Sequence, residues 1–502
     1  MPVLESKAIG GGLAIALSAL LINIAAPVGG NLPLLAWIAF APWLASLSGL
    51  RWWSAACSGL AMGLAYVIPL HWATFAAAVA SAGWSGWMQQ LITLAFFISY
   101  TAPFAVFAAV AAALQRRWQL PHQTWALIRA GLLASLICGL WAPFPYTPVV
   151  TIVGFTSIFQ LASIGGEPLL LMLLLWPSAA LAGIFRDSAS GWRRWQALLP
   201  VSASLLAGTI YGQLHIAELD RAEAAGSGVR LSALPLQLNL PPQGASAQIL
   251  MRDRPGGQQS ALELTRAALQ RSKQCELVVW PETPLTLDRN APACARGAKV
   301  AAALGLPMLM QCYRPDGDQV QLTAEWLAPD GAAPQWHGKS SLVPLYEQPI
   351  FSKGGVAPGE PGTVFDLDAE RRIIPTLCYE LHSRRHMRQG VFNGGNVVAH
   401  MASFAPFERN PIDIWDQAMA QLRAVEFQIP ILRAANRGPA GWIDAAGRAR
   451  SLSERFGSGG ECLDIWSPAG PPSIFAYLSP ICAWLPGALV LALGWLGAGR
   501  RK

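Results

Sequence analysis

The chain has 502 residues, and its composition is that of a membrane protein rather than of an ordinary soluble domain. Hydrophobic residues make up 53% of it and charged residues 13%, whereas about a quarter of a typical soluble domain is charged. The net charge is +7, but the basic residues are not gathered into a stripe with interleaved aromatics, which argues against nucleic-acid binding. We therefore expect most of the chain to lie in lipid.

Eight segments are apolar enough and long enough to cross a bilayer, which requires about 20 residues in a helix. The predicted spans are 8–27, 33–50, 54–79, 89–114, 124–144, 166–185, 196–213 and 475–498. The first begins like a signal peptide after Lys7, but further spans follow it closely, so we expect it to be retained. The sequence thus predicts a membrane domain at 1–215, a polar domain at 220–470, and a last span with a basic tail at 475–502.

The loops between these spans alternate in charge, and this alternation predicts their orientation. The basic residues of alternate connections and of the tail are Arg51, Arg116, Arg117, Arg186, Arg193, Arg194 and 500–502. The intervening loops near 28–32, 80–88 and 145–165 contain no Lys or Arg. By the positive-inside rule both termini are cytoplasmic, and 220–470 lies on the periplasmic side of a bacterial inner membrane. One miscounted span would invert this assignment.

The polar block has the length of one globular domain and alternates between strand and helix patterns. The predicted strands are 231–238, 276–280, 307–313, 373–377, 396–401 and 430–435, and the predicted helices are 258–273, 294–304 and 412–428. Hairpin turns are indicated at 329–331, at 368–371 and at 444–447. Fully apolar strands that alternate with helices predict an α/β layered domain.

Three residues of this block have the chemistry that acyl transfer needs. Glu282 follows a short apolar strand, Cys378 follows the strand at 373–377, and Lys339 follows the second arm of a hairpin. A cysteine nucleophile needs a base that produces the thiolate, and a cation stabilises the negative charge that develops on the carbonyl oxygen. Each residue alone has a simpler explanation as a loop acid, a solvated lysine or an inert core thiol. Their occurrence together favours a catalytic set.

The order of these residues and their neighbours resemble the nitrilase superfamily, whose catalytic triad is Glu-Lys-Cys. The layout of the whole chain resembles the apolipoprotein N-acyltransferases, the membrane-embedded branch with a nitrilase-like domain between its last two spans. The resemblance is strongest at 280–282, at Lys339 with 342–344 and Glu347, at 378–380, at 423–426 and at 433–436. It implies a polytopic α-helical membrane protein that carries an extracytoplasmic αββα sandwich.

The resemblance also implies a reaction and a role for each residue. Cys378 would attack an ester carbonyl of a phospholipid, with Glu282 as general base and Lys339 as oxyanion stabiliser. The resulting thioester would pass its acyl chain to the α-amine of a lipoprotein's N-terminal diacylglyceryl-cysteine. Glu347 would orient Lys339, and Glu380 would assist from beside the nucleophile. No cofactor is implied, and we expect a monomer in membrane lipid.

Two apolar loops are candidates for admitting acyl chains. The loops at 346–355 and 403–407 either dip into the bilayer or pack on their own domain, and the sequence does not choose between these alternatives. The aromatic residues that we expect to bind substrate are Tyr346, Phe351, Tyr379, Phe404 and Phe407.

Two segments depart from the pattern of the family. This chain reads His400-Met401-Ala402-Ser403-Phe404 where the family carries an Asn-Asp-x-Trp-Phe type segment, and Leu345-Tyr346 where Phe-Gly is usual. Both leave the triad intact and the acceptor open. The alternatives are a divergent nitrilase-like membrane protein of a conjugal-transfer system, an amidase-type hydrolase that uses water, and a catalytically silent scaffold.

Cysteine spacing gives no sign of a metal site, because the chain has no Cys-x-x-Cys. Three of the eight cysteines, Cys57, Cys138 and Cys482, fall in predicted spans. The polar block contains Cys378 and four others, namely Cys275, Cys294, Cys312 and Cys462. These four allow three disulfide pairings in an oxidising compartment, or four free thiols.

Overall fold

The computed structural model divides the chain into two compact units. One comprises Met1–Ala76, Ser85–Ile216 and Tyr477–Lys502, and the other comprises Ala77–Trp84 and Ala217–Ala476. The residues that the structure describes are 2–81, 83–142, 144, 146–184, 191–240, 260–272, 274–282, 293–344, 347–348, 356–407 and 410–499.

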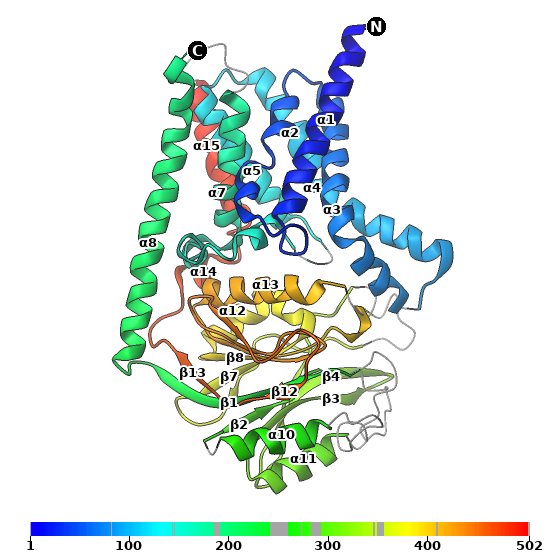
Figure 1. Cartoon of the computed structure of the whole chain (residues 1–502), viewed down its shortest axis with the longest axis vertical. Helices are drawn as coiled ribbons and strands as arrows, with labels where there is room; N and C mark the ends of the chain where they lie inside the picture. Colours follow the sequence, from blue (N-terminus) through cyan, green and yellow to red (C-terminus); the bar gives the residue numbers. More distant parts are fainter. Residues whose placement is uncertain are drawn as a thin grey trace. The chain divides into compact units, whose positions relative to one another are not determined.

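The first unit is helical (Figure 1). Its long helices are α1 (Pro2–Ala25), α3 (Trp52–Ser81), α4 (Gly86–Arg117), α5 (His122–Gly139), α7 (Ala162–Ile184), α8 (Leu199–Ala224) and α15 (Leu485–Gly499). Shorter turns of helix are η1 (Pro33–Trp37), α2 (Ala41–Ser46), η2 (Pro148–Ile152), α6 (Thr156–Phe159) and η3 (Gly191–Leu198). Within the described residues, four stretches are long and apolar enough to cross a membrane, namely Trp52–Ala80, Gly86–Arg117, Ala162–Ile184 and Trp195–Ala224. The count of eight spans stays a prediction.

Two of the predicted spans are not continuous helices. The span at 33–50 is broken into η1 and α2, and each of these short helices has a proline at its first or second position. The span at 475–498 is broken into α14 (Ile474–Leu478) and α15, with Pro480 between them. Proline lacks the N–H that a helix interior needs and suits the first turn, so it ends one helix and begins the next.

Small residues let α5 pack closely against α15. A Cβ on Gly131 of α5 would lie 2.9 Å from the side chain of Val490. The backbone N–H of Gly487 donates a 2.7 Å hydrogen bond to the hydroxyl of Ser135. In a membrane the hydrophobic effect does not drive helices together, because lipid tails are as apolar as the side chains. Close approach of two backbones then stabilises the helix pair through van der Waals contacts and hydrogen bonds.

The second unit is built on one sheet of 13 strands in the described residues. The strands are β1 (Val229–Leu238), β2 (Leu277–Val279), β3 (Met308–Asp316), β4 (Gln319–Leu327), β5 (Gln335–Gly338), β6 (Phe365–Asp366), β7 (Arg372–Leu377), β8 (Val397–Ser403), β9 (Ile431–Asn436), β10 (Gly441–Ile443), β11 (Ala449–Ser451), β12 (Gly459–Gly460) and β13 (Leu463–Ser467). The main path runs β5-β4-β3-β2-β1-β9-β8-β7-β6. The first part of β1 pairs with β2 and β13, and its last part pairs with β9 and β12. One strand therefore belongs to both halves of the sheet.

The two halves of the sheet enclose an apolar layer, and helices cover their outer faces. Leu277 and Val279 of β2 share the inner layer with Ile373 of β7, while Val278 faces the helix side. On that side lie α10 (Ala261–Arg271) and α11 (Ala293–Leu304); the other half carries α12 (Arg384–Phe392) and α13 (Ile412–Phe427) (Figure 1). Strands that bury both faces must be apolar throughout, which explains their sequence. The predicted α/β layering is confirmed.

The elements missed from the sequence are the β3–β4 hairpin, α12, β12 and β13. The β3–β4 turn is Gly317-Asp318, between the paired residues Asp316 and Gln319, with Gly317 at a φ of +58°, and Gly-Asp between two strands is a hairpin signal. The helix α12 is rich in arginine and is capped by Ser383, whose hydroxyl accepts a hydrogen bond from the N–H of His386. The six predicted strands are present, and the three predicted helices are present within the described residues, 258–259 and Lys273 lying outside them.

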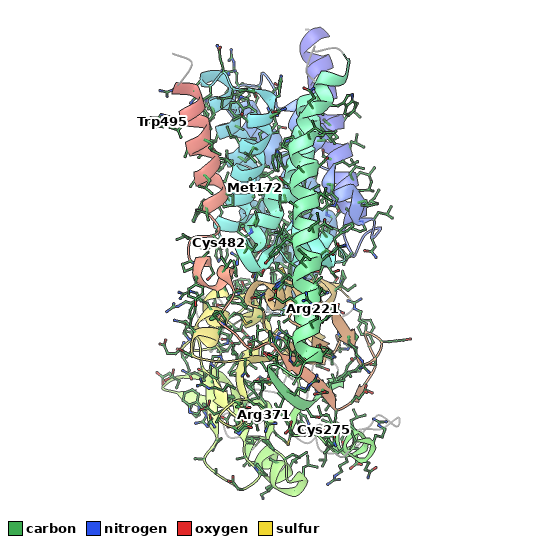
Figure 2. All side chains as sticks on the ribbon, turned by 90° about the vertical axis from the view of Figure 1, so that its left-hand side faces the viewer. Met172, Arg221, Cys275, Arg371, Cys482 and Trp495 are labelled. Carbon is green, nitrogen blue, oxygen red and sulfur yellow. A yellow bond between two sulfur atoms is a disulfide. The ribbon has the colours of Figure 1, made fainter. Side chains whose placement is uncertain are left out.

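Two disulfides decide among the three pairings that the sequence allows. Cys275 bonds to Cys462 and Cys294 bonds to Cys312, with Cα atoms 5.6 and 6.0 Å apart. Figure 2 labels Cys275, which stands just before β2. The first bond spans 187 residues and the second spans 18. The first therefore ties the beginning of the domain to its end.

We predict that the Cys275–Cys462 bond stabilises the protein more than the Cys294–Cys312 bond. By the chain-entropy relation, closing the long loop contributes about 5 kcal/mol and closing the short loop about 3 kcal/mol. Thermal unfolding in detergent of Cys275→Ser/Cys462→Ser should occur at a lower midpoint than that of Cys294→Ser/Cys312→Ser. Equal midpoints for the two double variants would contradict this ranking.

Candidate active site

Cys378 stands where β7 ends and the turn η4 (Cys378–His382) begins. Its φ is +45°, a left-handed conformation that residues other than glycine seldom adopt. Such strain persists only where the surroundings fix it. The N–H of Leu377 donates to Glu380 at 3.1 Å on one side, and His400 Nε2 donates to the carbonyl oxygen of Cys378 at 3.1 Å on the other. The turn thus holds Cys378, a residue of intermediate exposure, at the end of the strand.

Glu380 is fully buried and links the cysteine turn to the segment that carries the lysine. Besides Leu377, its carboxylate accepts hydrogen bonds from the backbone N–H of Ser340 at 2.7 Å, from the Ser340 hydroxyl and from His337 Nε2 at 3.0 Å. Burial raises the pKa of Glu380, but the histidines His337 and His386 and these donors outweigh it, so the pKa lies well below its ordinary value. The carboxylate is ionised and occupied by its donors.

Lys339 directly follows β5 and is held at both of its backbone groups. Its N–H donates to the carbonyl of Leu322 at 2.8 Å, and its own carbonyl accepts from the N–H of Gly359 at 2.9 Å. The side chain is completely buried. Its ammonium donates to Glu347 at 2.7 Å and more weakly to Glu282 at 3.4 Å. The second oxygen of Glu347 accepts from the N–H of Val343 at 2.7 Å, so Glu347 cannot turn away.

These groups and the thiol interact electrostatically. Burial lowers the pKa of Lys339, but the negative charges of Glu282 and Glu347 outweigh it and raise the pKa well above its ordinary value. Burial raises the pKa of Glu347; Lys339 lowers it, and the net shift is upward. Burial and the charge of Glu282 raise the pKa of the Cys378 thiol well above its ordinary value, although Lys339 opposes them. The resting thiol therefore keeps its proton at neutral pH.

The predicted substrate-binding aromatic residues that the structure describes lie in different surroundings. Tyr379 lies on η4 beside the thiol, and its ring meets that of His382 edge to face with centroids 5.4 Å apart. Phe404 and Phe407 are buried, and the Phe404 ring lies against Gly438 of the same unit. Of the two alternatives for the loop at 403–407, packing on its own domain therefore fits the structure better than insertion into the bilayer.

Other predicted residues lie outside the described part of the chain. Tyr346 and Phe351 do so, and so does most of the loop at 346–355, apart from Glu347, Gln348 and Val356 onward. Their role in substrate binding stays a prediction.

A second buried polar layer under the cysteine turn was not predicted. Asp416 of α13 accepts from Arg433 Nη2 at 2.9 Å and lies 3.3 Å from His382 Nε2. Burial raises the pKa of Asp416, but Arg433 and His382 outweigh it, so the carboxylate is ionised. Burial lowers the pKa of His400 to about 4, which leaves that ring neutral and able to donate to the Cys378 carbonyl. The only signal in the sequence was the departure from the family pattern at His400.

His337, Glu380 and His386 lie close enough to hold a metal ion, with potential ligand atoms within 4.8 Å of one another. Their ligand atoms are already in use. His386 Nδ1 accepts from the N–H of Gly362 at 3.0 Å, and His386 Nε2 donates to the carbonyl of Pro375 at 2.9 Å. Since the Glu380 oxygens also have their donors, the cluster is a hydrogen-bond network that braces two segments of the site.

Comparison with known proteins places this geometry in a family. The model of the carbon-nitrogen hydrolase family matches residues 243–456. Among curated proteins, the apolipoprotein N-acyltransferase of Geobacter metallireducens is 28% identical over 482 residues, which cover 88% of this chain and 86% of the relative. That of Bradyrhizobium diazoefficiens is 24% identical over 495 residues, 89% of this chain and 86% of the relative. Of solved structures, Saccharomyces cerevisiae Nit3, a member of branch 10 of the nitrilase superfamily, matches 50% of this chain and 94% of its own with a TM-score of 0.39 and 16% identity.

The second unit is thus a carbon-nitrogen hydrolase domain, joined to a helical unit with four stretches apolar and long enough to cross a membrane. The similarity to curated relatives extends over most of the chain and includes that helical unit. This similarity agrees with the resemblance to the apolipoprotein N-acyltransferases of the nitrilase superfamily that the sequence shows.

We predict that Glu380→Gln destabilises the protein at neutral pH by about 3 kcal/mol, because a neutral amide cannot match four donors to a buried carboxylate. The folded pKa of Glu380 lies below its ordinary value of 4.5, so its stabilisation is present above that pH and is lost as the pH falls. Thermal unfolding in detergent should therefore show a gap between variant and wild type at pH 7 that narrows by about pH 3.5.

Glu370→Gln is the matched control, because Glu370 is exposed. It should leave the unfolding midpoint unchanged at both pH values. A constant gap between Glu380→Gln and the wild type would show that the carboxylate is not held in its ionised form.

Proposed function

We propose that the protein moves an acyl chain from a phospholipid, through a thioester on Cys378, to the α-amine of the N-terminal diacylglyceryl-cysteine of a lipoprotein. The observation that supports this proposal best is the buried group of Glu282, Lys339 and Glu347 around a thiol that is held in a strained turn. Similarity to apolipoprotein N-acyltransferases over 88% of the chain gives the substrate class.

In the first half-reaction, Glu282 accepts the proton of Cys378 and the sulfur attacks the ester carbonyl carbon. The negative charge moves from Glu282 to sulfur and then to the carbonyl oxygen, so the buried site never gains a net charge. The tetrahedral oxyanion is stabilised by the Lys339 ammonium, which is desolvated and prealigned and therefore effective. As the intermediate collapses, the C–O bond breaks, Glu282 returns its proton, and a lysophospholipid leaves.

In the second half-reaction, the α-amine of the acceptor attacks the thioester carbonyl. A second oxyanion forms beside Lys339, the C–S bond breaks, and the amine gives up one proton as the thiol reforms. The lengths of the two Lys339 contacts suit different roles for Glu347 and Glu282. The 2.7 Å bond to Glu347 fixes the ammonium, and the longer 3.4 Å contact leaves Glu282 available to accept a proton.

We also propose that the chain crosses a bacterial inner membrane eight times and places the domain at 220–470 in the periplasm. The alternation of basic and uncharged loops supports the orientation. The two disulfides of the domain support it independently, because disulfides persist in oxidising compartments and are rare in the cytosol.

We predict that Cys378 becomes acylated when the purified protein is incubated with phosphatidylethanolamine. Intact-mass spectrometry should detect one acyl adduct, which a diacylated lipopeptide discharges with formation of a triacylated peptide. Cys378→Ser should form no product, because Glu282 activates the less acidic hydroxyl poorly.

The fate of the adduct distinguishes the alternatives. Hydrolysis of the adduct without peptide product would indicate an amidase-type hydrolase or a different acceptor, as in a conjugal-transfer protein. Absence of any adduct on folded wild-type protein would indicate a silent scaffold.

We predict that Lys339→Ala lowers the rate of acyl transfer by about a hundredfold or more, the usual cost of a lost oxyanion donor. Lys299→Ala is the matched control, because Lys299 is exposed on α11, and it should leave the rate unchanged. The rates should be compared on protein that is monodisperse in gel filtration. A loss of less than about threefold would make Lys339 a structural residue rather than an oxyanion donor.

A further inference from the structure

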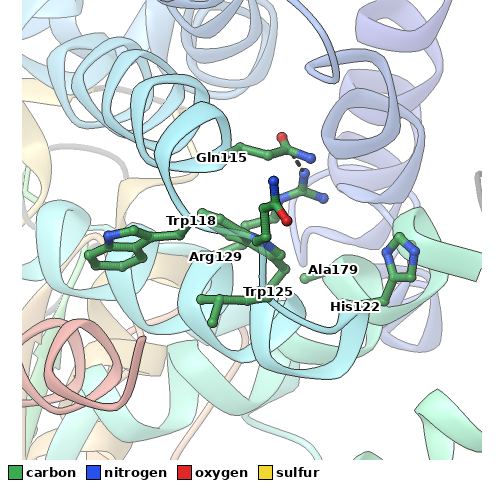
Figure 3. A pocket seen from close by; sticks show the side chains of 9 residues that line it. Gln115, Trp118, His122, Trp125, Arg129 and Ala179 are labelled. Carbon is green, nitrogen blue, oxygen red and sulfur yellow. Dashed lines mark hydrogen bonds between the residues drawn. The ribbon is translucent and has the colours of Figure 1, made fainter. Parts of the chain in front are cut away.

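A cavity of about 210 Å³ lies within the helical unit, between the end of α4, the beginning of α5 and the end of α7 (Figure 3). Its lining residues are Gln115, Trp118, Gln119, Leu120, His122, Trp125, Arg129, Ala179 and Gly183. The proposed acyl transfer uses none of them. The chemistry of the walls indicates what the cavity binds.

The polar wall includes the donors of Arg129 and of the Gln115 and Gln119 amides, and none of the nine lining residues is acidic. Arg129 is only 5% exposed, and its guanidinium donates to the side-chain oxygen of Gln115 at 3.2 Å. In Figure 3 the guanidinium and the Gln115 amide point toward one another. Because arginine presents its donors as a planar fork that matches phosphate oxygens, a buried arginine on a cavity wall favours a phosphate group.

The surroundings of the cavity add positive potential. The helix α5 begins at His122 and has no side-chain cap, so its first N–H groups and the positive end of its dipole lie at this wall. Tryptophan is typical of the level at which lipid headgroups lie, and Trp118 and Trp125 form part of the wall.

We propose that this cavity binds a phosphate group through Arg129, either the headgroup phosphate of a phospholipid or a free phosphate anion. This site shares no residue with the proposed acyl-transfer site. Its chemistry also differs, because the ligand is bound and none of its bonds is broken. Binding would tie α4, α5 and α7 together, since all three helices contribute to the walls.

The proposal is tested by binding to the purified full-length protein in a neutral detergent. One arm titrates phosphatidylglycerol and counts bound lipids by native mass spectrometry; the other measures the unfolding midpoint with inorganic phosphate. We expect Arg129→Gln to weaken binding by tenfold or more, the scale of a lost hydrogen bond to a charged group. Arg129→Lys, which keeps the charge and loses the fork, should weaken it less.

Two further variants make the test specific. Arg117→Gln removes a neighbouring charge outside the lining and should leave binding within about twofold of wild type. Gly183→Leu fills the cavity and leaves Arg129 in place; its Cβ would meet only His122, at an ordinary 3.7 Å, so the helix should tolerate it. This variant should lose binding even if Arg129→Gln does not fold.

The two arms identify the source of the phosphate. Retention of one lipid that both Arg129→Gln and Gly183→Leu lose supports a headgroup site. A rise in midpoint with inorganic phosphate alone, lost in the same variants, supports a site for the free anion. Equal binding by wild type, Arg129→Gln and Gly183→Leu in both arms overturns the proposal.

Discussion

The site depends on one buried ammonium held between two carboxylates. Removing a lysine from water costs several kcal/mol, and only close, well-oriented partners offset that cost. Lys339 has such partners in Glu347 and Glu282, at 2.7 and 3.4 Å. Glu347 is fixed in turn by a backbone N–H, so the position of the charge is set by the fold rather than by solvent. The proposed movement of charge from Glu282 to sulfur and on to the carbonyl oxygen depends on this arrangement.

A second carboxylate, that of Glu380, fixes the backbone around the site, as the carboxylate of Glu347 fixes the Lys339 ammonium. Glu380 accepts from Leu377 on the cysteine side and from Ser340 on the lysine side, so one side chain sets the distance between the two segments. The strained φ of Cys378 is possible because this carboxylate and His400 hold the turn from two sides. Glu347 and Glu380 thus have different roles. Glu347 contacts the ammonium of Lys339, and Glu380 positions the backbone segments that carry Lys339 and Cys378.

Much of this arrangement could be predicted, for physical reasons that apply to particular segments. The strands β2 and β7 are apolar on both faces, so they were recognisable, and the residues that follow them were the natural candidates. The contacts of Glu380 were not predictable, because His337 and Ser340 are some 40 residues away in sequence. The broken helices at 33–50 and 475–498 have a local cause in proline, which a count of apolar residues does not register. The disulfide pairing depends on which strands are neighbours, and composition does not contain that information.

The place of β1 in the sheet has a consequence for how the domain is made. Its first residues pair with β13, so the strand nearest the beginning of the domain needs the strand nearest its end, and the Cys275–Cys462 bond joins the same two regions. A ribosome delivers these partners more than 200 residues apart. The domain therefore cannot reach its native sheet while its own chain is still emerging. Cys275 emerges first but must wait for Cys462, so Cys294 and Cys312 are the first native pair to be complete. Synthesis of this protein requires a period in which a long, strand-rich intermediate waits for its last segment.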